Sequence, residues 1–189
     1  MRTALPAAVR DAAAHFHSGD YPLPVWLSTA LGPHFDGQTI LGGDVVLPAD
    51  LTIILPFLPG VFAHEWAHRV LRHNTVMILC GAVAGISLIV VATLNHITLQ
   101  NLAEWLIICS TLVFNALLLP LLGRYCEVAA DAWVAHHAPS EAALLRDYFA
   151  QQADKLASWA TWLVDPHPAP SQRRRAIAEQ LHRSTETQN

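Results

Sequence analysis

The sequence has 189 residues, of which 53% are hydrophobic and only 14% are charged, with a formal net charge of −4. This length suits one domain with its own core, and the apolar excess over ordinary soluble domains indicates residence in a membrane. The acidic balance excludes the basic surface that nucleic acid binding requires, so we expect no nucleic acid partner. Three cysteines in apolar settings do not form a disulfide framework. We therefore expect a single membrane-associated domain over residues 1–189.

The N-terminal third predicts helix, then strands, then helix. Residues 3–17 are rich in alanine and predict a short amphipathic helix, and Arg10 and Asp11 within them argue against a cleaved signal peptide. The β-branched runs 25–29 and 39–47, interrupted by proline and glycine, predict two or three short strands. An apolar helix is then expected from about Asp50 to His73, with prolines near its start. The fold class is therefore mainly α with a small β-sheet.

Two long apolar runs follow. The first, Thr75 to Leu94, has twenty residues without a charge, which as a helix is about 30 Å, the thickness of a bilayer's hydrocarbon core. The second covers about 103–122, and the short polar segment between them predicts an antiparallel transmembrane hairpin at about 75–94 and 103–122. Burial of both runs in a soluble core is the alternative, although so small a domain could hardly cover them. Gly81 and Gly85 predict close packing of the two spans.

Basic residues flank only the open end of this hairpin. Arg69 and Arg72 precede it and Arg124 follows it, whereas the connecting segment has neither lysine nor arginine. The positive-inside rule then places the open end in the cytoplasm. After the hairpin we expect a helix to about His137, another from about 140 to 164, and a basic C-terminal helix after a proline-rich turn.

The segment "HEWAH" carries the clearest chemistry. His64 and His68 are four residues apart on one helical face, where two imidazoles can share one zinc ion. Glu65 lies beside them and can act as general base on metal-bound water. His73 is nine residues beyond His64, so on a continuous helix it points about 180° away. We therefore expect His73 to be interfacial or solvated, and a third ligand to come from elsewhere.

The hairpin itself suggests that third ligand. The first span begins about seven residues after His68, and the second ends about five residues before Glu127. Because helical rise is constant, both side chains reach similar heights above the membrane, which favours Glu127 as the third metal ligand. Asp131 is four residues further on the same helical face. It is a candidate for orienting a zinc-bound histidine, with direct ligation or a solvated helix face as alternatives.

Taken in order, HEWAH, the hairpin and "RYCEVAADAW" resemble the HtpX and type I CAAX prenyl protease family of membrane zinc metallopeptidases. The resemblance implies a zincin-like domain with an inserted transmembrane hairpin, in which Glu127 and Asp131 match the segment that supplies the third ligand. It also implies, through "HPAPSQR", that His167 helps to stabilise the oxyanion and that Arg173 supports the site or the substrate. From the residues alone, His167 reads as a turn residue and the arginines as a solvated or headgroup-facing patch.

The function expected is that of an integral-membrane zinc metalloendopeptidase with one zinc ion per chain and Glu65 as general base. The resemblance implies a bacterial inner membrane, a cytoplasmic active site, and an extended polypeptide substrate paired to an edge strand at about 38–47. Membrane-protein quality control and processing of a specific peptide are both open, as is the oligomeric state. The alternatives are a signalling metalloprotease of the BlaR/MecR type and a non-catalytic membrane zinc-binding protein.

Overall fold

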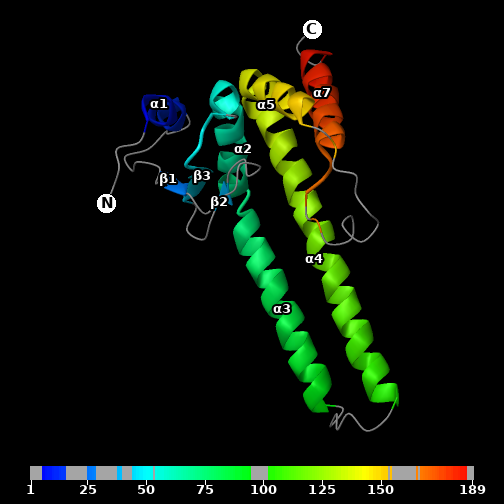
Figure 1. The fold of residues 1–189 in the computed structure, drawn as a ribbon. Helices are drawn as coiled ribbons and strands as arrows, with labels where there is room; N and C mark the ends of the chain where they lie inside the picture. The colour runs from blue at the N-terminus through cyan, green and yellow to red at the C-terminus, as the bar shows by residue number, and fades with distance from the viewer. Residues whose placement is uncertain are drawn as a thin grey trace.

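The structure, a computed structural model, combines a helical domain that carries a small sheet with a long helical hairpin that projects from it (Figure 1). It describes residues 6–15, 25–28, 38–39, 44–52, 54–94, 102–152, 154, 165 and 167–186. The mainly α fold with a small sheet and two long apolar helices confirms the predicted fold class.

The sheet follows a short N-terminal helix, α1 (Ala7–His15), and has three strands in the order β1-β3-β2. The central strand β3 (Val45–Pro48) pairs in parallel with β1 (Val25–Ser28) and antiparallel with β2 (Gln38–Thr39). The prediction of one edge strand over 38–47 was therefore wrong. Both sides of β3 are hydrogen-bonded, and among the described residues of 38–47 the sheet edge is formed by β2, which contacts α2.

The HEWAH motif lies on α2 (Leu58–Val70), which begins later and ends earlier than expected. A single 3-10 turn, η1 (Leu55–Phe57), precedes α2, and Pro59 lies in the first turn of α2, where its missing N–H costs nothing. At the other end, Arg72 adopts a φ of 54° and separates α2 from the next helix. The predicted continuous helix to His73 was thus wrong at this break.

The hairpin consists of α3 (His73–Leu94) and α4 (Leu102–His137), which are long and apolar enough to cross a membrane. Its large apolar side chains lie on the surface, as the exposed fraction of 65% for Val83 illustrates. The predicted contact through Gly81 and Gly85 was wrong, since a Cβ at either position would meet no heavy atom within 4 Å. Helices α3 and α4 do contact each other, but these glycines face elsewhere.

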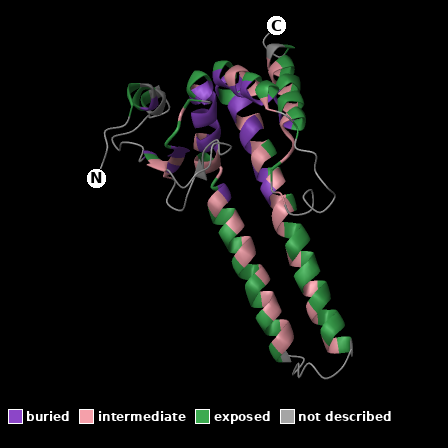
Figure 2. Cartoon of the chain, viewed as in Figure 1, coloured by how far each residue is buried: buried purple, intermediate pink, exposed green. Residues whose placement is uncertain are grey.

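The second half of α4 leaves the hairpin and enters the domain, where burial is concentrated (Figure 2). There α5 (Pro139–Gln151) packs against α2 and α4, and α7 (Pro170–Glu186) packs against α4 and α5. The backbones of α2 and α5 approach so closely that a Cβ on Gly60 would lie 2.6 Å from the carbonyl oxygen of Glu141. Glycine is thus required at the point where α2 meets α5. The predicted helix over 140–164 is observed only as far as Gln151, the end of α5, because Gln152 is extended; 153 and 155–164 lie outside the described residues.

Candidate metal centre

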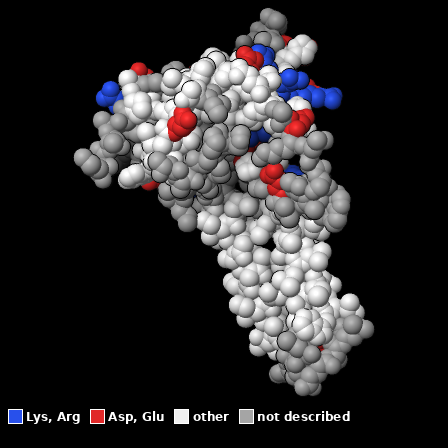
Figure 3. Space-filling view, viewed as in Figure 1, with Lys and Arg blue, Asp and Glu red and all other residues white. Residues whose placement is uncertain are grey.

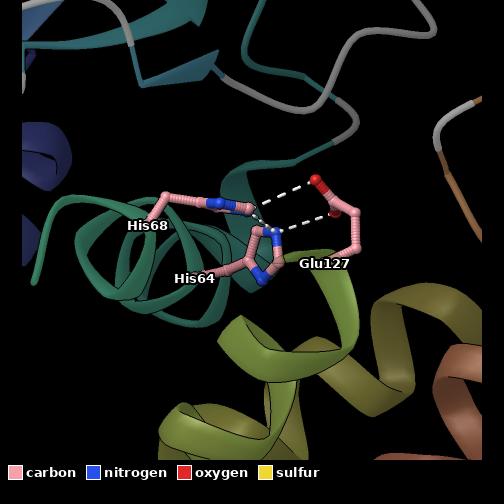
Figure 4. Close-up of side chains that lie close together, drawn as sticks. All are labelled: His64, His68 and Glu127. Carbon is pink, nitrogen blue, oxygen red and sulfur yellow. Dashed lines mark hydrogen bonds and ion pairs between the residues drawn. The ribbon is translucent and has the colours of Figure 1, made fainter. Parts of the chain in front are cut away.

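Helix α2, which precedes the hairpin, and the end of α4 that lies in the domain bring three candidate ligands together. His64 and His68 project from α2, and the carboxylate of Glu127 on α4 faces both imidazoles (Figure 4). The distance from His64 Nε2 to Glu127 Oε2 is 3.2 Å, and that from His68 Nε2 to Glu127 Oε1 is 3.3 Å. The two histidine Nε2 atoms are 2.9 Å apart. Residues 63 positions apart in sequence thus form one compact donor set.

This donor set fits a zinc ion. Zinc ligands lie at about 2.0–2.1 Å from the ion, so tetrahedral geometry separates neighbouring donor atoms by about 3.3 Å. The three separations above, 2.9, 3.2 and 3.3 Å, are close to that edge length. Two histidines and one glutamate are also a donor set found at catalytic zinc sites, where a fourth position stays open. Among the described residues, these three form the group that could hold a metal.

Glu127 reaches the histidines because α4 continues past its apolar part without a break. Beyond the predicted span, α4 buries Cys126, Ala130 and Val134 in the domain, which fixes the rotation of the helix. Because these three side chains face the core, Glu127 and Asp131 are turned towards α2 and α7. The turn of helix that follows the hairpin is therefore the part that completes the donor set.

Asp131 contacts the opposite ring nitrogen of His64. Its Oδ1 lies 2.9 Å from His64 Nδ1, while His64 Nε2 faces Glu127. Asp131 is almost completely buried, with 1% of its surface exposed. An Nδ1–H that donates to a carboxylate leaves the Nε2 lone pair free for a metal, and it also fixes the plane of the ring. The solvated-face alternative for Asp131 was therefore wrong.

Arg173, on the first turns of α7, is buried and forms ion pairs with both Asp131 and Glu127. Its Nε and Nη2 donate to the two carboxylate oxygens of Asp131 at 2.8 and 2.7 Å. Its Nη1 lies 3.0 Å from Glu127 Oε2, and its guanidinium stacks on the ring of Phe149 at 4.2 Å from the centroid. The planar guanidinium thus links both carboxylates in one arrangement. The alternative of a solvated or headgroup-facing arginine was wrong for Arg173.

Taken together, the charged groups of this cluster shift one another's pKa values towards the ionised forms. Burial alone would raise the pKa of Glu127, but Arg173 and hydrogen bonds from the two histidines outweigh it and hold that pKa well below its ordinary value. Burial likewise opposes ionisation of Asp131, and Arg173 again lowers the pKa. Burial and Arg173 disfavour a charged His64, yet the carboxylates outweigh them and raise its pKa to about 9. A metal that binds His64 must therefore displace a proton.

His167 lies at the rim of the donor set. Its side chain is 58% exposed, and its Nε2 is 3.9 Å from Glu127 Oε1. On the other side of the ring, Nδ1 lies 3.2 Å from Asp165 Oδ1, and the same oxygen accepts the backbone N–H of His167 at 2.9 Å. Arg124 donates from Nε to the backbone carbonyl of Asp165 at 3.1 Å, which ties this turn to α4.

Asp165 and Arg124 were not predicted to act near the site. An aspartate two residues before His167 is typical of a turn in which the side chain accepts a backbone N–H, so "DPH" carried a usable signal for Asp165. Arg124 was considered only for membrane orientation, and nothing in its local sequence indicated a contact 41 residues away.

Glu65 and His73 are both buried, which for His73 corrects the prediction. Glu65 follows His64 on α2 inside the domain. His73 was expected to be interfacial or solvated, but only 7% of it is exposed, and its Nδ1 lies 2.8 Å from His68 Nδ1. The expectation failed because the chain changes direction at Leu71 and Arg72 rather than continuing the helix of His64.

The comparisons with known proteins agree with this geometry. The model of the family described as peptidase family M48 matches residues 12–181, which include the HEWAH helix, both hairpin helices and the part of α7 that carries Arg173. No curated protein and no solved structure matches the chain. A match over most of the chain shows the family, as the resemblance noted in the sequence implied. The chain therefore belongs to peptidase family M48 and is a metallopeptidase.

Proposed function

We propose that this protein is a membrane-embedded zinc metalloendopeptidase whose single zinc ion is bound by His64, His68 and Glu127. The observation that carries the proposal is the mutual approach of three donor atoms, at 2.9–3.3 Å, from helices on either side of the apolar hairpin. When bound, zinc would lower the pKa of a water molecule towards about 7 and polarise the scissile carbonyl.

Four side chains have roles in the proposed reaction besides the ligands. Glu65 accepts a proton from the attacking water and passes it to the leaving amine. His167, held beside Asp165, donates a hydrogen bond to the developing oxyanion, which its position at the rim supports. Asp131 and Arg173 orient His64 and Glu127 through the buried contacts described above. The reaction class is peptide bond hydrolysis.

The proposed unit is one membrane-associated domain with the hairpin inserted between the HEWAH helix and the helix of the third ligand. In the face shown in Figure 3, the hairpin is almost free of charged side chains, whereas basic and acidic groups gather over the domain. Arg69, Arg72 and Arg124 all belong to the domain end of the hairpin. The positive-inside rule then supports a cytoplasmic active site, which we propose for a bacterial inner membrane.

The proposed substrate is an extended polypeptide. Among the described strands, β2 lies at a sheet edge and contacts α2, the helix that carries His64 and His68. A substrate strand added there would gain main-chain hydrogen bonds with little side-chain selectivity. Such a site suits unfolded segments of membrane proteins, and we propose membrane-protein quality control as the role.

Conversion of Glu65 to glutamine tests the proposed activity. Glu65→Gln retains the size of the side chain but cannot accept a proton, so the purified variant should bind one zinc ion and lose at least about a hundredfold of its cleavage of an unfolded model protein. Glu179→Gln, at an exposed position on α7, is the matched control and should cleave like wild type. Equal cleavage by Glu65→Gln contradicts the mechanism. Zinc in wild type without cleavage of any peptide would support a non-catalytic zinc protein instead.

A further inference from the structure

A second contact, which is partly buried, mirrors the contact between Asp131 and His64. His68 presents Nε2 to Glu127 at 3.3 Å, and its other ring nitrogen, Nδ1, lies 2.8 Å from Nδ1 of His73. The two rings meet edge to face, with centroids 4.9 Å apart and planes inclined by 73°. Each of the two candidate metal-binding histidines therefore has a buried partner on the side away from Glu127.

The backbone between α2 and α3 brings His73 back towards His68. The N–H of Leu71 still bonds to the carbonyl of Ala67 at 2.9 Å, and the N–H of Arg72 bonds to the carbonyl of Arg69 at 3.1 Å. Arg72 then takes the left-handed conformation, with φ 54°, and α3 begins at the next residue. This conformation is strained for a residue other than glycine, so the surrounding contacts must compensate for it. One result of the turn is the contact of His73 with His68.

The chemistry of two facing ring nitrogens fixes their roles. One must donate and the other must accept, because two lone pairs or two N–H groups would repel at 2.8 Å. If His68 binds zinc through Nε2, its remaining proton is on Nδ1. His68 Nδ1–H is then the donor, and His73 Nδ1 is the acceptor, with the proton of His73 on Nε2.

We propose that His73 is a positioning residue that accepts the Nδ1–H of His68 and so directs His68 Nε2 at the metal. This inference rests on the proposed zinc site and deepens it. His64 and His68 are then oriented by acceptors of different kinds, a carboxylate and a neutral imidazole. Partners of this kind fix the tautomer and ring plane of a metal-binding histidine, and their loss weakens metal affinity by about 10- to 100-fold.

Two substitutions of equal shape separate this role from simple packing. In asparagine, Oδ1 is bonded to Cγ as Nδ1 is in histidine, so His73→Asn retains an acceptor near the same place. Leucine has the branching of asparagine but no polar atom. The zinc dissociation constant, measured by competition with a chelator, should rise about 10- to 100-fold in His73→Leu and stay within about threefold of wild type in His73→Asn.

Two further measurements complete the test. The unfolding temperature of each metal-free variant reports on folding, and if His73→Leu does not fold, His73→Gln replaces it, with an acceptor displaced by one bond. X-ray absorption should count two zinc-bound imidazoles in wild type and in His73→Asn. A count that falls by one in His73→Asn would make His73 a ligand and overturn the proposal.

The outcomes also distinguish this inference from the proposed function. If wild type binds no zinc, the proposed function and the role of His73 both fail. If wild type binds zinc and His73→Leu binds it equally tightly, or if both variants are equally weakened, only the role of His73 fails.

Discussion

The hairpin and the domain of this protein reverse the usual relation between polarity and burial. In the hairpin, Val83, Ile89 and Phe114 each expose about two thirds of their surface, at 65%, 66% and 64%. In the domain, the charged Asp131 and Arg173 are buried to 1% and 6% exposure. Helix α4 belongs to both regions. Its first half exposes apolar side chains, and its second half buries a charged side chain, Asp131, inside the domain.

This difference is what we expect if the hairpin lies in a membrane and the domain in water, as proposed above. Apolar side chains in water would cost free energy across the whole hairpin, a cost that lipid removes. Buried charges, in contrast, are tolerated because each is paired: Arg173 contacts both Glu127 and Asp131. The comparison predicts that the same substitution will have effects of very different size, depending on the surroundings of the side chain that it replaces.

Removing a carboxylate gives the largest expected contrast. Glu127→Ala should abolish stoichiometric zinc binding and peptide cleavage, because the remaining two histidines are an incomplete donor set. Glu104→Ala, in the first turn of α4 at the far end of the hairpin, should retain one zinc ion and full activity. Metal analysis and a cleavage assay on the purified proteins measure both. Loss of zinc in Glu104→Ala, or retention of zinc in Glu127→Ala, would contradict the assignment of Glu127 as a ligand.

Removing a buried positive charge should be the next largest effect. Arg173→Met removes the guanidinium that contacts both Asp131 and Glu127 inside the domain, and loss of one member of a buried pair costs about 3–5 kcal/mol. Arg174→Met, at the neighbouring exposed position, should change the stability by no more than about 0.5 kcal/mol. Thermal unfolding in detergent compares the two. Equal stability of the variants would mean that Arg173 is not needed to balance the acidic pair.

Adding a charge to the hairpin tests its surroundings. Val83 lies near the middle of α3, and Val83→Lys would place a charge there. Within a bilayer this lysine should cost about 2.5–3.5 kcal/mol of insertion free energy. Leu55→Lys, at a similarly exposed apolar position in the domain, should cost less than about 0.5 kcal/mol. The fraction of each variant inserted into membranes is the readout. If both variants are found in the soluble fraction with wild type, the hairpin does not span a membrane.

In the metal-free domain, the free energy of unfolding should depend on pH, an effect smaller than those of the substitutions above. The folded-state pKa of His64 is about 9, above the ordinary 6.5, so its protonated form stabilises the fold fully below about pH 6.5. That contribution is lost as the pH rises from 6.5 to 9, and should lower the free energy of unfolding by on the order of 1–3 kcal/mol. Unfolding in the presence of a chelator measures it, with His64→Gln as control. Stability of wild type that increases over this range would refute the assignment.

Patterns with a fixed geometric period were the predictable part of this molecule. Uncharged runs and constant helical rise were enough to expect the hairpin and to favour Glu127, because both depend on residue counts along nearly straight helices. The spacing of His64 and His68 also follows from one helical turn.

What could not be predicted depends on tertiary contacts. Neither glycine nor proline marks the break at Leu71 and Arg72, so the burial of His73 was missed. The rotation of α3 about its axis decides which side faces α4, and the motif of Gly81 and Gly85 does not determine it. Arg124 and Asp165 are 41 residues apart in sequence, and only the path of the chain between them brings them into contact.

Counting the imidazoles around zinc tests the central claim most directly, namely that the return of the chain through the hairpin supplies the third ligand. The side chain of histidine reaches about as far as that of glutamate, so Glu127→His should place a third imidazole on the ion. X-ray absorption should then find two imidazoles in wild type and three in Glu127→His, with ligand distances of about 2.0–2.2 Å. A count of two in both proteins, with zinc bound, would contradict the claim.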